Sequence, residues 1–341
     1  MQALIFNQMR YFKILSLFLL LNFSFTVKAS ELTIDERFTA IELVEASDPY
    51  AAFPLYQELV EQGHTEAKVR LGMLLLQGFD DENTKEVKLQ RSLKLLHEAA
   101  DDGSIKAYYE LAVIYHDGKN MSVQAELGLN WLIKAAESGE PRAQNQLGSF
   151  YLDGTFVAKN IETAIYWYQQ AIKQNYNSAK YNLANLYLDN IEITKENIMR
   201  AQALYLSAAN ENHSNSKFAL GNIYYDDKYG LKNEQKSYYW LNEAAGEGNT
   251  YAQTGLASCY RYGIGTEVDY EKALYWYQLS SDTTHDPISR YRLAEMHMLG
   301  LGTKVDLKKA REIFLQLSQE GYADGTTAVA QVDKLIAEKT D

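Results

Sequence analysis

Hydrophobic positions recur along this chain at the spacing of helices. Ala143, Leu147 and Tyr151 are four residues apart, so a helix would place them on one face. After a short connection a second run has the same property, with Ala164, Trp167, Tyr168 and Ala171 on one face. The stretch from 143 to 175 therefore predicts two helices joined by a short loop.

This helix pair repeats through most of the chain. Its most regular member is a leucine that recurs at steps of 36, 37 or 40 residues, at Leu71, Leu111, Leu147, Leu183, Leu220, Leu256 and Leu293. A glycine or alanine follows each leucine, and the four tryptophans share one later position in the unit, at Trp131, Trp167, Trp240 and Trp276. One helix pair cannot bury its apolar face alone, so the repeats predict an array of stacked pairs.

Small residues indicate how the two helices of a unit would pack. Gly148, like its counterparts after the other repeat leucines, leaves room for the partner helix to approach closely, and we expect the tryptophan to lie over this gap. Gly154 would end a first helix and Gly139 a second helix. Glycine suits these ends because it adopts the positive φ of a helix C-terminus without steric cost.

The sixth unit has the fullest set of these positions, at Ala252, Leu256, Tyr260, Gly263, Gly265, Asp269, Lys272, Ala273, Trp276 and Tyr277. In this set the chain resembles the Sel1-like repeat family, which is related to the tetratricopeptide repeats. The resemblance covers residues 67–321 and implies an all-α fold, a right-handed α-solenoid of stacked helix-turn-helix repeats. Departures are local, at Asn190, at Ser280–Ser281 in place of Ala-Ala, and at Leu95–Leu96 in place of Trp-Tyr.

The ends of the chain differ from the repeats. Around seven repeats at 67–321 we expect an N-terminal capping helix pair at 30–66, and a C-terminal capping helix and tail at 322–341. Residues 1–29 resemble a signal peptide, because Arg10 and Lys13 precede an apolar run, Ile14 to Val27, shorter than the roughly 20 residues of a membrane span. We therefore expect export to the periplasm or secretion from a Gram-negative bacterium, with no membrane span in the mature chain. An uncleaved anchor is the alternative.

The net charge limits the classes of partner, and the cysteine content limits the covalent cross-links within the chain. The net charge is −12, and without residues 1–29 it would be −15, because 30 basic residues would face 45 acidic ones. This balance argues against nucleic acid or an anionic membrane surface as the main partner. Cys259 is the single cysteine, so no internal disulfide can form, and we expect a half-buried structural thiol.

No catalytic, cofactor or metal site is predicted. The six histidines are scattered over different units, and no two have the i, i+4 spacing of a helical zinc pair. His297 replaces the repeat tyrosine and is expected to be a packed residue. The segment from Ser214 to Lys217 formally matches the S-x-x-K of penicillin-recognising enzymes. Because the accompanying K-T-G is absent and the segment starts a repeat helix, we interpret the match as coincidence.

The remaining candidate surface is the concave face, which the first helices line in tetratricopeptide-like arrays. Exposed positions are expected two residues before and two after the repeat leucine, which gives the partner-binding candidates Tyr109, Asn145, Tyr181, Asn185, Phe218, Asn222 and Tyr291. Asparagine amides can pair with a peptide backbone or with sugar hydroxyls, and aromatic rings offer flat apolar area. The alternative is that the tyrosines only fill gaps between repeats.

These observations favour a non-enzymatic exported adaptor or regulator that binds a protein partner, or a peptide segment of one, through its concave face. By resemblance, Sel1-like proteins of the bacterial envelope act as assembly factors, sensor-kinase regulators or host-interaction proteins. A scaffold for envelope glycans suits the same lining of tyrosine and asparagine. A penicillin-recognising hydrolase is a third alternative with less support.

Overall fold

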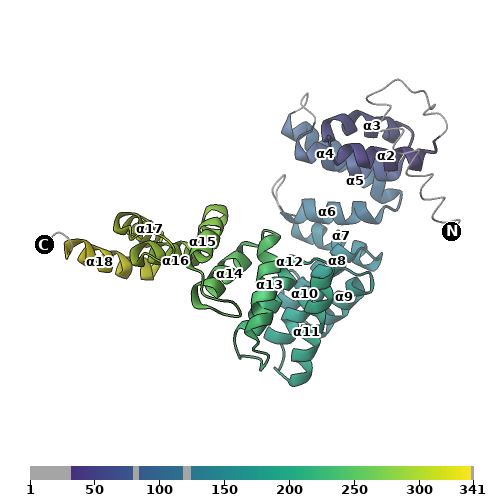
Figure 1. Ribbon diagram of the computed structural model, residues 1–341. Coiled ribbons are helices and arrows are strands. Elements are labelled where there is room, and N and C mark those ends of the chain that lie inside the picture. Colours follow the sequence, from purple (N-terminus) through teal and green to yellow (C-terminus); the bar gives the residue numbers. More distant parts are fainter. Residues whose placement is uncertain (1–31, 80–83, 118–123, 339–341) are drawn as a thin grey trace, which may run out of the picture. The chain divides into compact units, whose positions relative to one another are not determined.

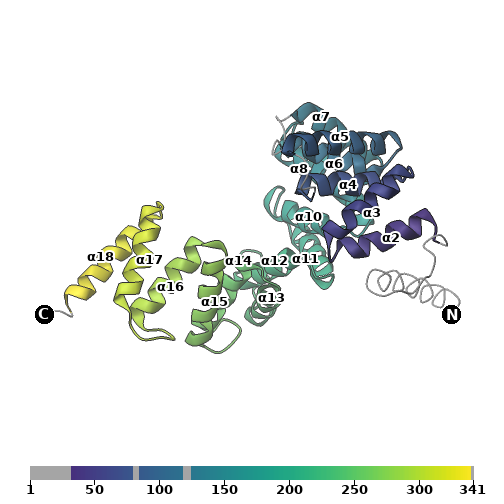
Figure 2. The ribbon, with the colours of Figure 1, turned by 90° about the horizontal axis from the view of Figure 1, so that it is seen from above.

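The computed structural model describes residues 32–79, 84–117 and 124–338, so the predicted signal peptide at 1–29 lies outside the described residues. All the secondary-structure elements in these ranges are α-helices, and they are labelled α2 to α18 (Figures 1 and 2). The chain divides into two compact units, residues 1–174 and 175–341.

The first unit contains four helix pairs: α2 (Ile34–Glu45) with α3 (Pro49–Glu61), α4 (Thr65–Gln77) with α5 (Lys85–Asp101), α6 (Ile105–Asp117) with α7 (Ala125–Glu137), and α8 (Pro141–Asp153) with α9 (Ile161–Lys173). Each second helix also packs against the first helix of the next pair, so the pairs form one stack within this unit. The core of the stack is continuous from Leu96 of α5 through Leu111 and Leu132 to Leu147 of α8.

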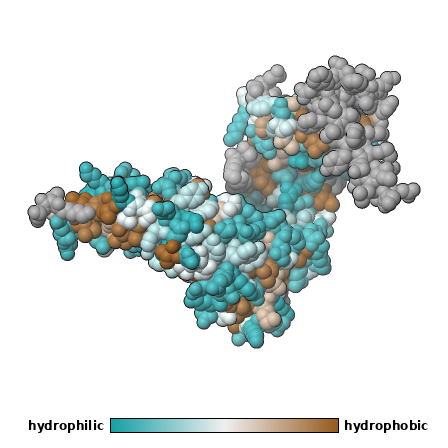
Figure 3. Space-filling model, in the orientation of Figure 1, coloured by the Kyte–Doolittle hydropathy of each residue, from teal (hydrophilic) through white to brown (hydrophobic). Residues whose placement is uncertain are grey.

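The second unit contains four further pairs and a last helix: α10 (Asn177–Asp189) with α11 (Lys195–Asn210), α12 (Ser214–Tyr225) with α13 (Glu234–Gly246), α14 (Thr250–Tyr262) with α15 (Tyr270–Thr284), α16 (Pro287–Leu299) with α17 (Leu307–Gln319), and α18 (Ala323–Ala337). Ala328 and Val332 of α18 pack against Phe314 of α17. In Figure 3, hydrophobic residues lie over these two helices. The predicted all-α array of stacked helix pairs is confirmed.

Where the small residue is glycine, at Gly72, Gly148 and Gly221, it faces the residue after the tryptophan position. A Cβ built on Gly148 of α8 would lie 2.8 Å from the ring of Tyr168 in α9, and one on Gly221 would lie 2.6 Å from Leu241 Cγ. The prediction that the tryptophan covers this gap was therefore wrong. The second helix turns the next residue, not the tryptophan, toward its partner.

Trp131 instead contacts its own first helix and the preceding repeat. The ring of Trp131 in α7 stacks on Tyr108 of α6 with 5.8 Å between centroids, and it meets His97 of α5 at 5.7 Å. Trp131 thus links α7 to α6 within its own repeat and to α5 of the preceding repeat.

Polar caps and glycines set the helix ends. Second helices begin after a side chain that accepts a hydrogen bond from the backbone three residues on, at Asn160, Asn233, Asp269 and Asp306. Gly154 and Gly139 have φ of 78° and 100°, as the sequence predicted. Gly265 serves a second purpose, because a Cβ there would lie 2.1 Å from the carbonyl oxygen of Glu234, at the start of the preceding second helix.

Cys259 is fully buried in the core of the second unit, so the prediction of a half-buried thiol was wrong. It lies three residues after Leu256 and belongs to the same hydrophobic cluster as Leu256 and Tyr260. Burial raises the pKa of its thiol to about 12, which keeps the sulfur protonated and unreactive. None of the helices in the described ranges has the length and apolarity to cross a membrane.

Candidate binding surface

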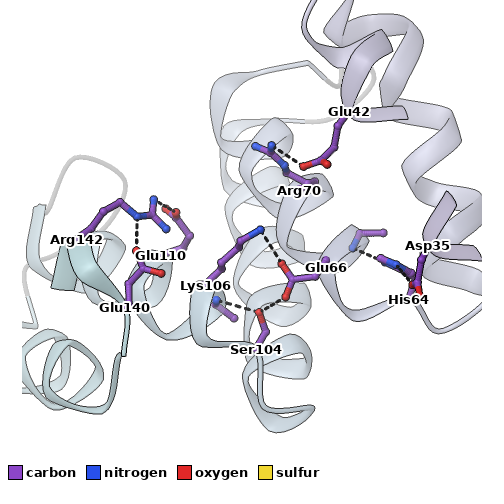
Figure 4. Close-up of polar contacts among 12 residues, drawn as sticks. Asp35, Glu42, His64, Glu66, Arg70, Ser104, Lys106, Glu110, Glu140 and Arg142 are labelled. Carbon is purple, nitrogen blue, oxygen red and sulfur yellow. Dashed lines mark hydrogen bonds and ion pairs between the residues drawn. The ribbon is translucent and has the colours of Figure 1, made fainter. Parts of the chain in front are cut away.

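Tyr109, the predicted binding residue of α6, is half-buried against the next repeat. The guanidinium of Arg142, at the start of α8, lies 4.2 Å from the centroid of its ring. Arg142 is itself paired with Glu110 at 3.0 Å and with Glu140 at 2.7 Å (Figure 4). Burial raises the pKa of the Glu110 carboxyl, and Arg142 opposes this shift. An ion-paired arginine thus covers the tyrosine.

Successive first helices of the first unit are joined by similar polar contacts (Figure 4). Arg70 of α4 lies 3.0 Å from Glu42 of α2, and Lys106 of α6 lies 3.4 Å from Glu66 of α4. Ser104 also donates a hydrogen bond of 2.8 Å to Glu66. Paired charges therefore join neighbouring first helices of this unit, and one of them, Arg142, covers the predicted residue Tyr109.

The predicted aromatic residues of the second unit also pack against the repeat that follows them. Ring centroids are 5.6 Å apart for Tyr181 and His213, 5.9 Å for Phe218 and Tyr251, and 6.0 Å for Tyr291 and Tyr322. All three candidates are half-buried, whereas the sequence predicted exposed positions. The contacts agree with the alternative that these rings fill gaps between repeats.

The predicted asparagines differ from one another. Asn185 accepts a hydrogen bond from the hydroxyl of Tyr205 in its partner helix α11. Serines hold the same position in two other repeats, where Ser149 and Ser258 pair with the tyrosine hydroxyls of Tyr168 and Tyr277. Asn145 is half-buried, and Asn222 is exposed. Of the predicted amides, Asn222 is the one most accessible to a partner.

Three strongly exposed tyrosines on first helices of the second unit were missed by the sequence prediction. These are Tyr225 of α12 and Tyr251 and Tyr262 of α14, of which Tyr251 is 66% exposed. At 100° per residue, positions five before and five or six after the repeat leucine lie on the side of the helix opposite that leucine. They share this side with Phe218 and Asn222. The helical period could have found them, but the prediction used only two positions per repeat.

A charged cluster lies beside these tyrosines. Glu295 of α16 accepts hydrogen bonds of 2.8 Å from both Arg261 of α14 and Arg292 of α16. Burial is the main cause of the raised pKa of Tyr225, and the neighbouring Cys259 adds to it. Arg292 partly opposes this rise. Two guanidinium groups around one carboxylate leave a net positive charge on an otherwise acidic protein.

We use the name tyrosine face for Phe218, Asn222, Tyr225, Tyr251 and Tyr262 together with the cluster formed by Arg261, Arg292 and Glu295. Aromatic rings and arginine are enriched at the centre of protein interfaces, where rings bury much area and arginine forms several hydrogen bonds. The arrangement suits binding and contains no nucleophile paired with a base.

The segment that matches S-x-x-K lacks catalytic geometry. The ammonium of Lys217 bonds Glu247, the residue that follows α13, and lies 3.3 Å from Asn212. No hydrogen bond joins it to Ser214, whose hydroxyl is buried without a partner among the described residues. Elsewhere in the described ranges, no three His, Cys, Asp or Glu side chains come together in a way that could hold a metal ion.

Comparisons with known proteins agree with the fold. The family described as Sel1 repeat matches residues 65–104, 105–140, 141–176, 177–213, 214–249, 250–282 and 287–322. A protective antigen of uropathogenic Escherichia coli with an SLR fold, c5321, is 23% identical, with a TM-score of 0.71 over 90% of this chain and 66% of that one. A Sel1 repeat protein from Oxalobacter formigenes is also 23% identical, with a TM-score of 0.63 over 88% and 86% of the two chains. This chain thus spans just under two thirds of the E. coli protein.

Proposed function

The chain belongs to the Sel1 repeat family, and we propose that it is a non-enzymatic adaptor or regulator that binds a protein partner through the first helices of its second unit. The tyrosine face is the observation that carries this proposal. Tyr225, Tyr251 and Tyr262 are each at least 40% exposed and lie beside the charged cluster on one side of their helices, and a group of exposed aromatic residues at one place is typical of an interaction site.

Charge supports a partner with acidic as well as apolar groups at this face. Arg292 is the more exposed of the two arginines that hold Glu295, so its guanidinium can reach a carboxylate of the partner. The overall negative charge of the chain would repel a strongly acidic partner elsewhere. The positive cluster would therefore orient the complex.

The location of the protein is proposed from residues 1–29, which have the charge and apolar pattern of a signal peptide. In this proposal the partner is a protein of the periplasm or of the extracellular space. A penicillin-recognising hydrolase is not favoured, because Lys217 is engaged by Glu247 and has no contact with Ser214.

Capture after mild cross-linking in a native envelope extract tests the proposal. The immobilised wild-type protein is compared with Tyr251→Ala/Tyr262→Ala. The matched control is Tyr166→Ala/Tyr239→Ala, which removes two tyrosines of similar exposure from second helices. We expect one protein to be enriched by the wild type and the control and lost with the Tyr251/Tyr262 variant. Equal enrichment by all three would overturn the assignment of the face, and no enriched protein would overturn the adaptor function.

A further inference from the structure

A tyrosine four residues after the repeat leucine closes the groove between neighbouring second helices. Tyr260 of α14 shares a hydrogen bond of 3.0 Å with Tyr238 of α13, and the ammonium of Lys272 in α15 lies 5.2 Å from its ring centroid. The preceding repeat has the same arrangement, with Tyr224 bonded by Gln202 at 2.7 Å and covered by Lys236 at 5.2 Å. Each tyrosine thus links its own repeat to the second helix before it.

His297 of α16 stands at this position in the last repeat, and the groove there stays open. The residues equivalent to Tyr238 and Lys272 are Leu274, which is 36 residues further on, and Lys309, which is 37 residues further on. The side chain of Leu274 cannot form a hydrogen bond, and both ring nitrogens of His297 lack a partner among the described residues. Tyr275, the residue before Trp276, is 60% exposed, and the equivalent Tyr166 and Tyr239 are 51% and 53% exposed.

A cavity of about 350 Å³ occupies the open groove, a volume within the range of roughly 300–1,000 Å³ typical of small-molecule sites. Its floor is His297, and its walls are Tyr275 and Asp282 of α15 and Lys309 of α17. Gln278 and Lys309 also line a second cavity of about 530 Å³, so the two spaces adjoin along the groove.

His297 indicates what kind of group belongs in the cavity. The ring is 7% exposed, and burial together with the nearby Lys309 lowers its pKa, so the imidazole is neutral. A neutral imidazole has one nitrogen that donates and one that accepts, and leaving both unpaired is costly. A carboxylate could satisfy only the donor and an ammonium only the acceptor. A hydroxyl group can satisfy either nitrogen.

The walls of the cavity also offer both hydrogen-bond donors and acceptors. Lys309 offers a donor and makes no ion pair in the described part of the chain, whereas Glu271 and Asp282 offer acceptors. The exposed ring of Tyr275 provides a flat apolar surface beside them. Charges of both signs around an aromatic ring suit a neutral molecule with several hydroxyl groups and one apolar face.

We propose that the groove between α15 and α17 is a binding site for a neutral mono- or disaccharide, with His297 at its floor and Tyr275 as its stacking surface. His297 lines the cavity, and the torsion that turns an imidazole ring is soft, so the ring can turn a nitrogen toward a bound molecule. This site involves the second helices and is independent of the proposed protein partner.

Calorimetric titration of the full chain with glucose, N-acetylglucosamine and maltose tests the proposal, with side-chain NMR of labelled histidines to locate binding. We expect saturable binding of at least one sugar below about 10 mM, with the largest shift at His297. No saturable binding of any of the three sugars up to that concentration would overturn the proposal.

Restoring the repeat tyrosine provides the decisive variant. His297→Tyr should fill the groove as Tyr260 does in the preceding repeat, raise Tm and weaken sugar binding at least tenfold. Tyr260→Phe, which alters the neighbouring joint without opening this groove, is the control and should bind as the wild type does. Asp282→Asn, on the exposed rim, should also weaken binding and serves if His297→Tyr fails to fold. Undiminished binding by the folded groove variants would contradict the site.

Discussion

The ammonium group of Lys180 lies 2.9 Å from a carboxylate oxygen of Glu211, although the lysine side chain is only 5% exposed. Lys180 stands three residues before the repeat leucine of α10, and Glu211 follows the last residue of α11. Equivalent pairs are Lys68 with Asp102, Lys217 with Glu247, and Arg290 with Glu320. A cation at this place also faces the carbonyl groups at the end of the second helix, so each pair ties the two helices of a repeat together.

These pairs predict a loss of stability in acid. The basic partner lowers the pKa of the carboxyl groups of Asp102, Glu211 and Glu320 through a hydrogen bond. A carboxyl whose pKa is lower in the folded state stabilises the protein above its unfolded value, 4.5 for glutamate, and this contribution is lost as the pH falls through the folded value. Tm measured from neutral pH to about pH 3 should therefore fall most steeply below the ordinary carboxyl pKa. A Tm independent of pH in this range would contradict the pairing.

Removing the charge of Glu211 should destabilise the protein more than removing the charge of Lys180. Glu211→Gln leaves a buried ammonium without a counter-charge, whereas Lys180→Met leaves a carboxylate that water can solvate. We therefore expect thermal unfolding to show a larger fall in Tm for Glu211→Gln. The control is Arg200→Met, which breaks an exposed pair with Glu196 and should change Tm little. Equal effects of the three variants would argue against a structural role for the buried pair.

Because Gly148 lies so close to Tyr168, even a methyl side chain at position 148 should lower the stability of the protein. Gly148→Ala would place a Cβ 2.8 Å from the ring of Tyr168, which is buried and cannot move away freely, and should destabilise the protein by about 1–3 kcal/mol in denaturant unfolding. Gly246→Ala is the matched control, because its Cβ would meet nothing within 4 Å. It should be neutral or stabilise by up to about 1 kcal/mol. The reverse order of stability would contradict the packing described for this pair.

The bond between Tyr205 and Asn185 predicts that this asparagine has a structural role. Tyr205→Phe should cost about 1 kcal/mol, and a double-mutant cycle with Asn185→Ala should give a coupling of about the same size. Denaturant unfolding of the four proteins measures it. A coupling near zero would show that the two side chains act independently, and Asn185 would then be free to contact a partner.

Periodicity predicted the fold well because it depends on many positions at once. The leucine and the small residue recur in all seven repeats, and local departures such as Asn190 do not disturb the stack. The error about tryptophan arose because spacing places a residue on a face only to within one position. Gly148 accordingly meets Tyr168 and not Trp167.

The candidate surface was harder to predict, because exposure depends on contacts with the next repeat. Tyr109 and Tyr181 lie at positions that a single helix would expose, but Arg142 and His213 of the following repeats cover them. Long-range pairs such as Arg261 with Glu295 are 34 residues apart and have no local signature. The same limit applies to His297, whose replacement of tyrosine was visible in the sequence while the cavity beside it was not.

The most direct test of the central claim is the affinity of the captured partner, once purified, for the wild type and for Tyr251→Ala/Tyr262→Ala. Because both rings are largely exposed, their removal should leave Tm nearly unchanged, so that a loss of affinity reports on binding alone. We predict that isothermal titration calorimetry shows at least tenfold weaker binding, about 1.4 kcal/mol, for this variant. Tyr166→Ala/Tyr239→Ala should bind within about twofold of the wild type. Equal affinity of the wild type and the Tyr251/Tyr262 variant would contradict the assignment of the tyrosine face.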